Sequence, residues 1–153
     1  MNILALDTSS SRLLVALKAG GKTFAKTHTG GRANQALMPL IDALLKQAGI
    51  SIRCIDRFAA VVGPGSFTGI RVGVSVINAF CHATGKPAAG VTTLELLGIE
   101  QSSVADGKLP EFDADYDPEI LLRLAQSAPV KVSLEPFYMR KPQAERLLDG
   151  ETT

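Results

Sequence analysis

The chain has 153 residues, of which 46% are apolar and 20% are charged, and its formal net charge at pH 7 is +1. This length and composition are typical of one globular domain with a substantial core. The near-neutral charge argues against a protein that binds nucleic acid through a strongly basic surface of its own. Cys54 and Cys81 form no CxxC pattern, and no apolar run approaches the roughly 18 residues of a membrane span. We therefore expect a cytoplasmic protein with reduced thiols and no membrane partner.

The first part of the sequence predicts an antiparallel meander of three strands. Residues 2–7 and 13–17 are short apolar runs, and residues 22–28 alternate between apolar and polar side chains, as strands do. The Gly20–Gly21 pair between the second and third runs predicts a hairpin turn.

An amphipathic helix is expected next, with Asn34 as its N-cap and Gly49 just past its end. The apolar residues of this stretch recur at helical spacing and would form one buried face. They are Leu37, Leu40, Ile41, Leu44, Leu45 and Ala48.

A Gly-rich stretch, residues 63–73, follows the apolar run 58–62, which predicts a buried strand, a tight turn and a helix over residues 68–83. Such a turn directs backbone N–H groups to the mouth of the helix, where anions can bind. Small residues also recur four apart along the helix, and such rows let another backbone come close. We therefore interpret it as a docking helix. The small residues are Gly69, Gly73, Ser75, Ala79 and Ala83.

The remaining sequence predicts a short strand at residues 88–91, after which Thr92 caps a short helix. Asp117 and Pro118 open a last helix, and residues 130–134 predict a further strand.

The order of these elements is a meander of three strands, then helix, strand, helix and strand. This is the ribonuclease-H-like order, an α/β fold with a mixed sheet and flanking helices. We divide the chain into this lobe (1–101), a polar and acidic loop or linker (102–117), and a short helix with an extended tail that packs back on the lobe (118–153).

Several stretches resemble one known family. Residues 3–9 (ILALDTS), the Gly-rich stretch 63–73 and residues 90–94 (GVTTL) resemble the bacterial TsaB (YeaZ) family of tRNA threonylcarbamoyladenosine biosynthesis proteins, which are glycoprotease-like (M22) non-peptidase homologues. Residues 37–45 fit the family as well, and residues 136–140 (PFYMR) resemble its C-terminal signature. The resemblance is close over about the first hundred residues and rests on that short signature in the last forty.

The resemblance implies a lobe of the actin-like ATPase (ASKHA) superfamily, whose members have two ribonuclease-H-like lobes. It further implies a non-catalytic subunit that pairs with the catalytic paralogue TsaD and the ATPase TsaE to place a threonylcarbamoyl group on adenosine 37 of tRNA. The chain would form a homodimer when alone and would meet tRNA only through the complex. The helix over residues 68–83 would be the interface. The contact residues expected are Thr68, Gly69, Arg71, Val72, Gly73, Ser75, Val76, Ile77, Ala79, Phe80 and Ala83.

The sequence departs from the family in two respects. Few residues separate the stretch at 90–97 from the signature at 136–140, so we expect a reduced C-terminal lobe in this sequence. Many relatives also carry a histidine near position 33, where this chain has Ala33 and Asn34. A role that depends on that histidine is therefore absent. Arg71 opposes the dipole of the interface helix, and it either pairs with a carboxylate of a partner or is solvated.

A second candidate site resembles the first phosphate loop of the superfamily, in which an Asp positions Mg²⁺ or a water and the next residues meet phosphate. The alternative is a structural turn without a ligand, and the Gly-rich turn has no Walker lysine. Since nucleotide in the superfamily lies between two lobes, we expect no cofactor for this chain alone, and ATP or Mg²⁺ only at a composite interface. The residues concerned are Asp7, Thr8, Ser9, Gly63, Gly65 and Ser66.

Two other functions stay open beside the scaffold. One is a small nucleotide-binding or hydrolysing enzyme, or a peptidase relative, that uses Asp7 and the Gly63 loop. The other is an interaction module that dimerises without meeting the paralogue. His28 and His82 lie in no metal-ligand pattern, so we expect neither a metal site nor a metal-dependent peptidase.

Overall fold

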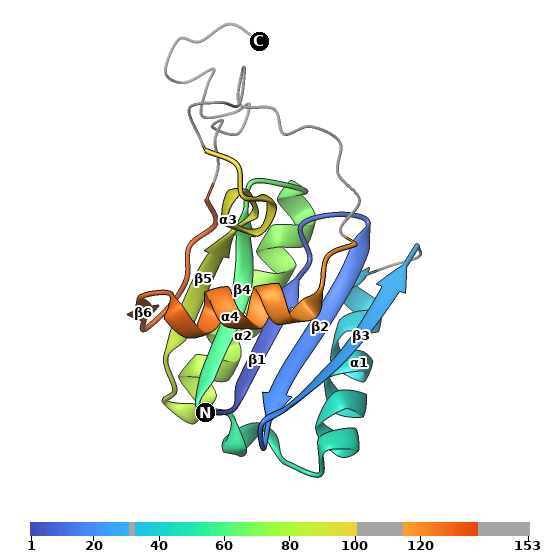
Figure 1. The fold of residues 1–153 in the computed structure, drawn as a ribbon, viewed down its shortest axis with the longest axis vertical. Helices are drawn as coiled ribbons and strands as arrows, with labels where there is room; N and C mark the ends of the chain where they lie inside the picture. The colour runs from blue at the N-terminus through green and yellow to red at the C-terminus, as the bar shows by residue number, and fades with distance from the viewer. Residues whose placement is uncertain (31–32, 101–114, 138–153) are drawn as a thin grey trace, which may run out of the picture.

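The structure is a computed structural model that describes residues 1–30, 33–100 and 115–137. Within these residues a six-stranded mixed sheet lies between helices on its two faces (Figure 1). The strand order across the sheet is β3-β2-β1-β4-β5-β6. The strands are β1 (Ile3–Asp7), β2 (Arg12–Ala19), β3 (Lys22–Thr29), β4 (Arg57–Gly63), β5 (Ala88–Thr92) and β6 (Val130–Lys131).

The pairing agrees with the order expected from the sequence. The first three strands pair in antiparallel fashion, and β4 then joins β1 in parallel and β5 joins β4 in parallel. The two-residue strand β6 adds an antiparallel strand beside β5. The prediction of a strand over residues 130–134 was therefore too long, because its later residues leave the sheet and run along a helix. The fold is α/β and ribonuclease-H-like.

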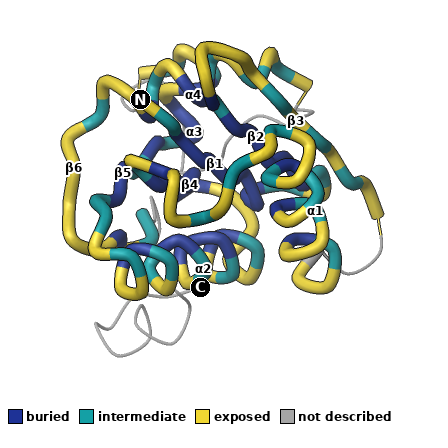
Figure 2. Tube along the Cα trace, turned by 90° about the horizontal axis from the view of Figure 1, so that it is seen from below, coloured by how far each residue is buried: buried dark blue, intermediate teal, exposed yellow. Residues whose placement is uncertain are grey.

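Helices cover the two faces of the sheet unequally (Figures 1 and 2). On one face lie α1 (Ala33–Ala48) and α2 (Phe67–Thr84), and on the other lies α4 (Pro118–Ser127). A short helix, α3 (Thr93–Leu97), follows β5, and a 3₁₀ turn, η1 (Ile52–Cys54), precedes β4. Figure 2 shows the buried side of α2 turned to the sheet and its exposed side turned outward.

Both faces of β1 are buried, which explains its unbroken apolar sequence. Leu4 and Leu6 point into the core beneath α1 and α2, and Ile3 and Ala5 point into the core beneath α4. These four residues are fully buried. Helix α4 contributes to this second core and therefore packs directly on the sheet. The tail from residue 138 onward lies outside the described residues.

Several helix ends follow the local signals in the sequence. Thr92 accepts a hydrogen bond from the Glu95 N–H at 3.1 Å, and Glu95 binds the Thr92 N–H in return, which makes a capping box. Asp117 caps α4 ahead of Pro118. The prediction of Asn34 as N-cap was wrong, because α1 begins at Ala33. In the described part of the chain, no helix is both long and apolar enough to cross a membrane.

Candidate functional site

The C-terminal ends of β1 and β4 lie at the same edge of the sheet. They bring residues 7–9, called the Asp7 loop below, beside the Gly-rich turn that precedes α2. Asp7 is fully buried, and its Oδ1 accepts hydrogen bonds from the Ser9 N–H at 2.9 Å and the Ser9 hydroxyl at 2.6 Å. Its Oδ2 accepts the hydroxyl of Tyr116 at 2.6 Å. Both carboxylate oxygens are therefore bound within the chain.

Helix α2 lies against this loop through its glycines. Thr8 donates its hydroxyl to the Gly69 carbonyl at 2.5 Å. A Cβ at Gly69 would collide with the Thr8 carbonyl oxygen, and one at Gly73 would collide with the Thr8 hydroxyl. Gly69 and Gly73 are thus needed so that α2 can lie close to Thr8.

The turn before α2 is held by the same loop. The Ser66 N–H donates to the Ser9 carbonyl at 2.8 Å, and a Cβ at Gly65 would lie 2.5 Å from that carbonyl oxygen. Ser66 also caps α2, since its hydroxyl accepts the Gly69 N–H at 3.2 Å. The turn is anchored from the other side by Thr93, whose hydroxyl donates to the Pro64 carbonyl at 2.6 Å.

The residues predicted to bind phosphate therefore lie together, but their polar groups face one another. Asp7, Thr8 and Ser9 are all buried, and the turn's backbone is fastened to Ser9. These groups do not fit a Mg²⁺ or a phosphate as arranged, because a ligand would have to displace the intrachain hydrogen bonds. Among the described residues, no group of three or more His, Cys, Asp or Glu could hold a metal.

The residues predicted as an interface lie on α2, but they divide between its two sides. Gly73 and Ile77 are buried in the chain's own core, and Gly69 lies against Thr8. Their small or apolar character serves this intrachain packing, and their contact with a partner stays a prediction. The other predicted residues remain exposed or partly exposed: Thr68, Arg71, Val72, Ser75, Val76, Ala79, Phe80 and Ala83.

A shallow hollow of about 410 Å³ lies on this outer side of α2. The Phe67 side chain is 40% exposed at its edge, and the Arg71 guanidinium lies 4.6 Å from the centre of that ring. The sequence suggested that Arg71 either pairs with a carboxylate of a partner or is solvated, and this contact with Phe67 was not expected. Its stacking on Phe67 keeps the cation on the outer surface near the start of the helix.

Comparison with known proteins agrees with this fold and with these motifs. The family model described as "TsaD: tRNA N6-adenosine threonylcarbamoyltransferase" matches residues 27–112, more than half of the 153 residues. A protein named tRNA threonylcarbamoyladenosine biosynthesis protein TsaB from Haemophilus influenzae is 34% identical over 98 residues, 61% of this chain and 40% of that protein. The protein of the same name from Bacillus subtilis is 32% identical over 117 residues, 74% of this chain and 51% of that protein.

The chain belongs to the TsaB (YeaZ) family. The solved structure of YeaZ from Pseudomonas aeruginosa matches with a TM-score of 0.61 and 34% identity, over 63% of this chain and 46% of that one. The fold is accordingly a ribonuclease-H-like lobe of the actin-like ATPase type. This TsaB-family chain spans about half, or less, of the length of these relatives.

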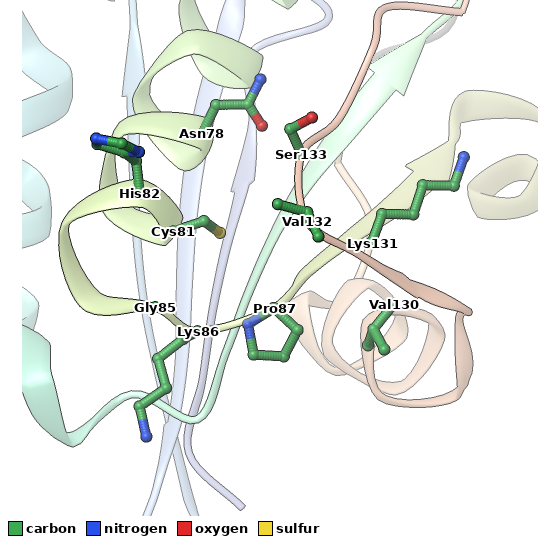
Figure 3. Close-up of a pocket in the computed structure, with 10 residues that line it drawn as sticks. All are labelled: Asn78, Cys81, His82, Gly85, Lys86, Pro87, Val130, Lys131, Val132 and Ser133. Carbon is green, nitrogen blue, oxygen red and sulfur yellow. The ribbon is translucent and has the colours of Figure 1, made fainter.

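A larger hollow is lined by none of the residues predicted for the two sites, although part of it lies on α2. It measures about 610 Å³ and lies between the end of α2 and the segment at β6 (Figure 3). Lys86, Lys131 and His82 line it, but their side chains point in different directions (Figure 3). We assign no role to this hollow in the TsaB-family chain.

Two residues that hold the Asp7 loop and α2 in place, Tyr116 and Asn78, carry no clear signal in the sequence. Tyr116, the partner of Asp7, lies 109 residues away from it. Asn78, on α2, binds the backbone of Leu134 by two hydrogen bonds. Neither residue belongs to a motif. The one local signal was the position of Tyr116 directly before the Asp117 cap.

Proposed function

We propose that this TsaB-family chain is a non-catalytic subunit in the synthesis of N6-threonylcarbamoyladenosine at position 37 of tRNA. It docks through α2 on a TsaD-like catalytic paralogue and stabilises it, together with the ATPase TsaE. In the absence of this partner it forms a homodimer through the same face. Contact with tRNA is made through the complex, in the cytoplasm.

The observation that carries this proposal is the outer side of α2. Its buried side is occupied by the chain's own loop and sheet, while a second row of small residues faces outward. Ser75, Ala79 and Ala83 lie four residues apart and are all exposed. Small side chains let the backbone of a second helix approach closely.

Apolar groups flank this outward row and give it the character of an interface. Val72, Val76 and Phe80 are half-buried beside it, and the exposed Phe67 carries Arg71 at one end. Aromatic and arginine side chains are enriched where protein surfaces bind each other. A face of this kind supports docking on a partner helix better than it supports catalysis.

The test is light scattering coupled to size-exclusion chromatography, with Ala79→Arg beside the unchanged chain. We expect a dimer that becomes a folded monomer in the variant, because the arginine fills the space between the helices. Gln47→Arg, on the exposed side of α1, is the matched control and should leave the dimer unchanged. Co-elution with a TsaD paralogue should be lost in Ala79→Arg and kept in Gln47→Arg.

The proposal fails if the unchanged chain is monomeric at high concentration and does not co-elute with the paralogue. Complementation of a strain that lacks its full-length TsaB then separates a working subunit from a module that only dimerises. Rescue by the unchanged chain, but not by Ala79→Arg, is the result expected. The rival small enzyme finds no support in the described residues around Asp7, whose polar groups are bound within the chain.

A further inference from the structure

A fully buried carboxylate is costly unless hydrogen bonds compensate for its lost hydration. Asp7 is such a group, with no exposed surface. Two of its hydrogen bonds come from its neighbour Ser9 and belong to the local turn. The third comes from Tyr116, which reaches the loop from a segment distant in sequence.

The Tyr116 hydroxyl lies 2.6 Å from Asp7 Oδ2, the oxygen that Ser9 does not bind. The phenol is half-buried and packs against the core cluster beneath α4. Its O–H occupies one acceptor site of this oxygen, which an external ligand would otherwise be able to use. A hydrogen bond from a hydroxyl to a carboxylate is short and strong, as this distance indicates.

The segment around Tyr116 is fastened to the lobe by neighbouring contacts. Asp115 forms an ion pair with Arg12 of β2 at 3.1 Å. Thr23 of β3 hydrogen-bonds Glu119 in the first turn of α4. Tyr116 lies between Asp115 and Glu119 in the sequence, and its hydroxyl hydrogen-bonds the buried Asp7 carboxylate.

Other polar groups of the Asp7 loop are also hydrogen-bonded within the described part of the chain. The Thr8 hydroxyl donates to the Gly69 carbonyl, and the Ser9 carbonyl accepts the Ser66 N–H. A ligand of Asp7 Oδ2 would therefore compete with the Tyr116 hydroxyl. The Asp7 loop and the segment before α4 are therefore coupled through the hydrogen bond from Tyr116 to Asp7.

We propose that the Tyr116 hydroxyl is a built-in ligand of Asp7, which ties the start of α4 to the lobe and closes the Asp7 loop to divalent cations. Asp7, which resembles the phosphate-loop aspartate of the superfamily, then serves as a structural anchor in this chain. This proposal is independent of the docking face on α2.

A double-mutant cycle in thermal unfolding tests the tie. We expect Tyr116→Phe to lower the melting temperature by about 3 to 12 °C, as the loss of one hydrogen bond to a charged group does in a chain of this size. The loss in Tyr116→Phe with Asp7→Asn should be clearly smaller than the sum of the two single losses, because both remove the same interaction. Asp115→Asn is the matched control one residue away. Its carboxylate is 77% exposed, so we expect a shift below about 4 °C.

The closure is tested by adding a paramagnetic divalent cation to the unmodified protein, with Asp7→Asn as the control. Mn²⁺ added to the ¹⁵N-labelled chain should cause no localised paramagnetic broadening at the amides of Asp7, Thr8 and Ser9. Broadening at these amides that is lost in Asp7→Asn would overturn the closure. Additive losses in the cycle, or a Tyr116→Phe shift no larger than that of Asp115→Asn, would overturn the tie.

Discussion

Asn78 on α2 holds the backbone of Leu134 through both groups of its amide. Its Nδ2 donates to the Leu134 carbonyl at 3.0 Å, and its Oδ1 accepts the Leu134 N–H at 2.7 Å. The Phe137 N–H also donates to the Val62 carbonyl at 2.7 Å. The last described segment is thus fastened at two points, to α2 and to β4, and its Leu134 side chain is buried in the core beneath α2.

We predict that Asn78→Ala lowers the free energy of unfolding by about 1–3 kcal/mol, because the variant leaves two backbone groups of Leu134 unpaired. Asn78→Asp should cost less, since it keeps the acceptor for the Leu134 N–H. Urea unfolding gives the free energies, and hydrogen exchange at the Leu134 amide gives the local effect. Unchanged exchange at this amide in Asn78→Ala would contradict the prediction.

Gly69 is expected to tolerate no side chain, although it lies in a helix. Alanine at this position should destabilise the protein by about 1–3 kcal/mol, because its Cβ would press on the Thr8 backbone and outweigh the gain in helix propensity. The reverse change on the outer side, Ala79→Gly, should cost about 1 kcal/mol from propensity alone. Denaturant midpoints measure both, and a stabilised Gly69→Ala would refute the close contact.

Arg57 joins β4 to the end of α4. Its NH1 donates to the carbonyls of Ala125 at 3.0 Å and Gln126 at 2.5 Å, and more weakly to Ala128 at 3.4 Å. We predict that Arg57→Ala costs about 1.5–3 kcal/mol of unfolding free energy, because hydrogen bonds from a charged donor are lost. Arg57→Lys should recover part of this loss, as it keeps the charge but not the planar fork. Equal losses in the two variants, seen in urea unfolding, would speak against a role for these hydrogen bonds.

The two cysteines should differ strongly in reactivity. Cys54 is exposed, and hydrogen bonds from Ser51 lower the pKa of its thiol, whereas burial raises the pKa of Cys81. We expect a disulfide reagent at neutral pH to label Cys54 rapidly and Cys81 only as the protein opens. Ser51→Ala should slow the labelling of Cys54. Mass spectrometry of the labelled peptides gives the two rates, and equal rates would contradict this difference.

Stability should fall in alkaline solution because of Tyr116. Burial, together with the Asp7 carboxylate, raises the pKa of Tyr116 in the folded protein above its ordinary value of 10.0. The unfolded chain therefore loses the phenol proton first, and the stabilisation that is full below about pH 10 is lost as the pH rises further. Tyr116→Phe should have a flatter alkaline limb in a plot of unfolding free energy against pH. Parallel curves for the two proteins would refute the assignment.

The strands and helices of the lobe could be predicted because their signals are local. The apolar run at β1, the alternation in β3 and the caps at Thr92 and Asp117 each act within a few residues. The family resemblance rests on the same local stretches. The ends of helices and strands were predicted less accurately, as Asn34 and the short β6 show. Tertiary contacts decide where a helix starts or a strand leaves the sheet.

The sequence by itself determined the α/β order, the Gly-rich turn into α2 and the presence of small residues along that helix. Only the tertiary structure decided which way each row of small residues faces. Gly69 and Gly73 face Thr8 inside the chain, while Ser75 and Ala79 face outward. A spacing of four places residues on one side of a helix, but it does not say what lies against that side. The position of α2 on the sheet settles this.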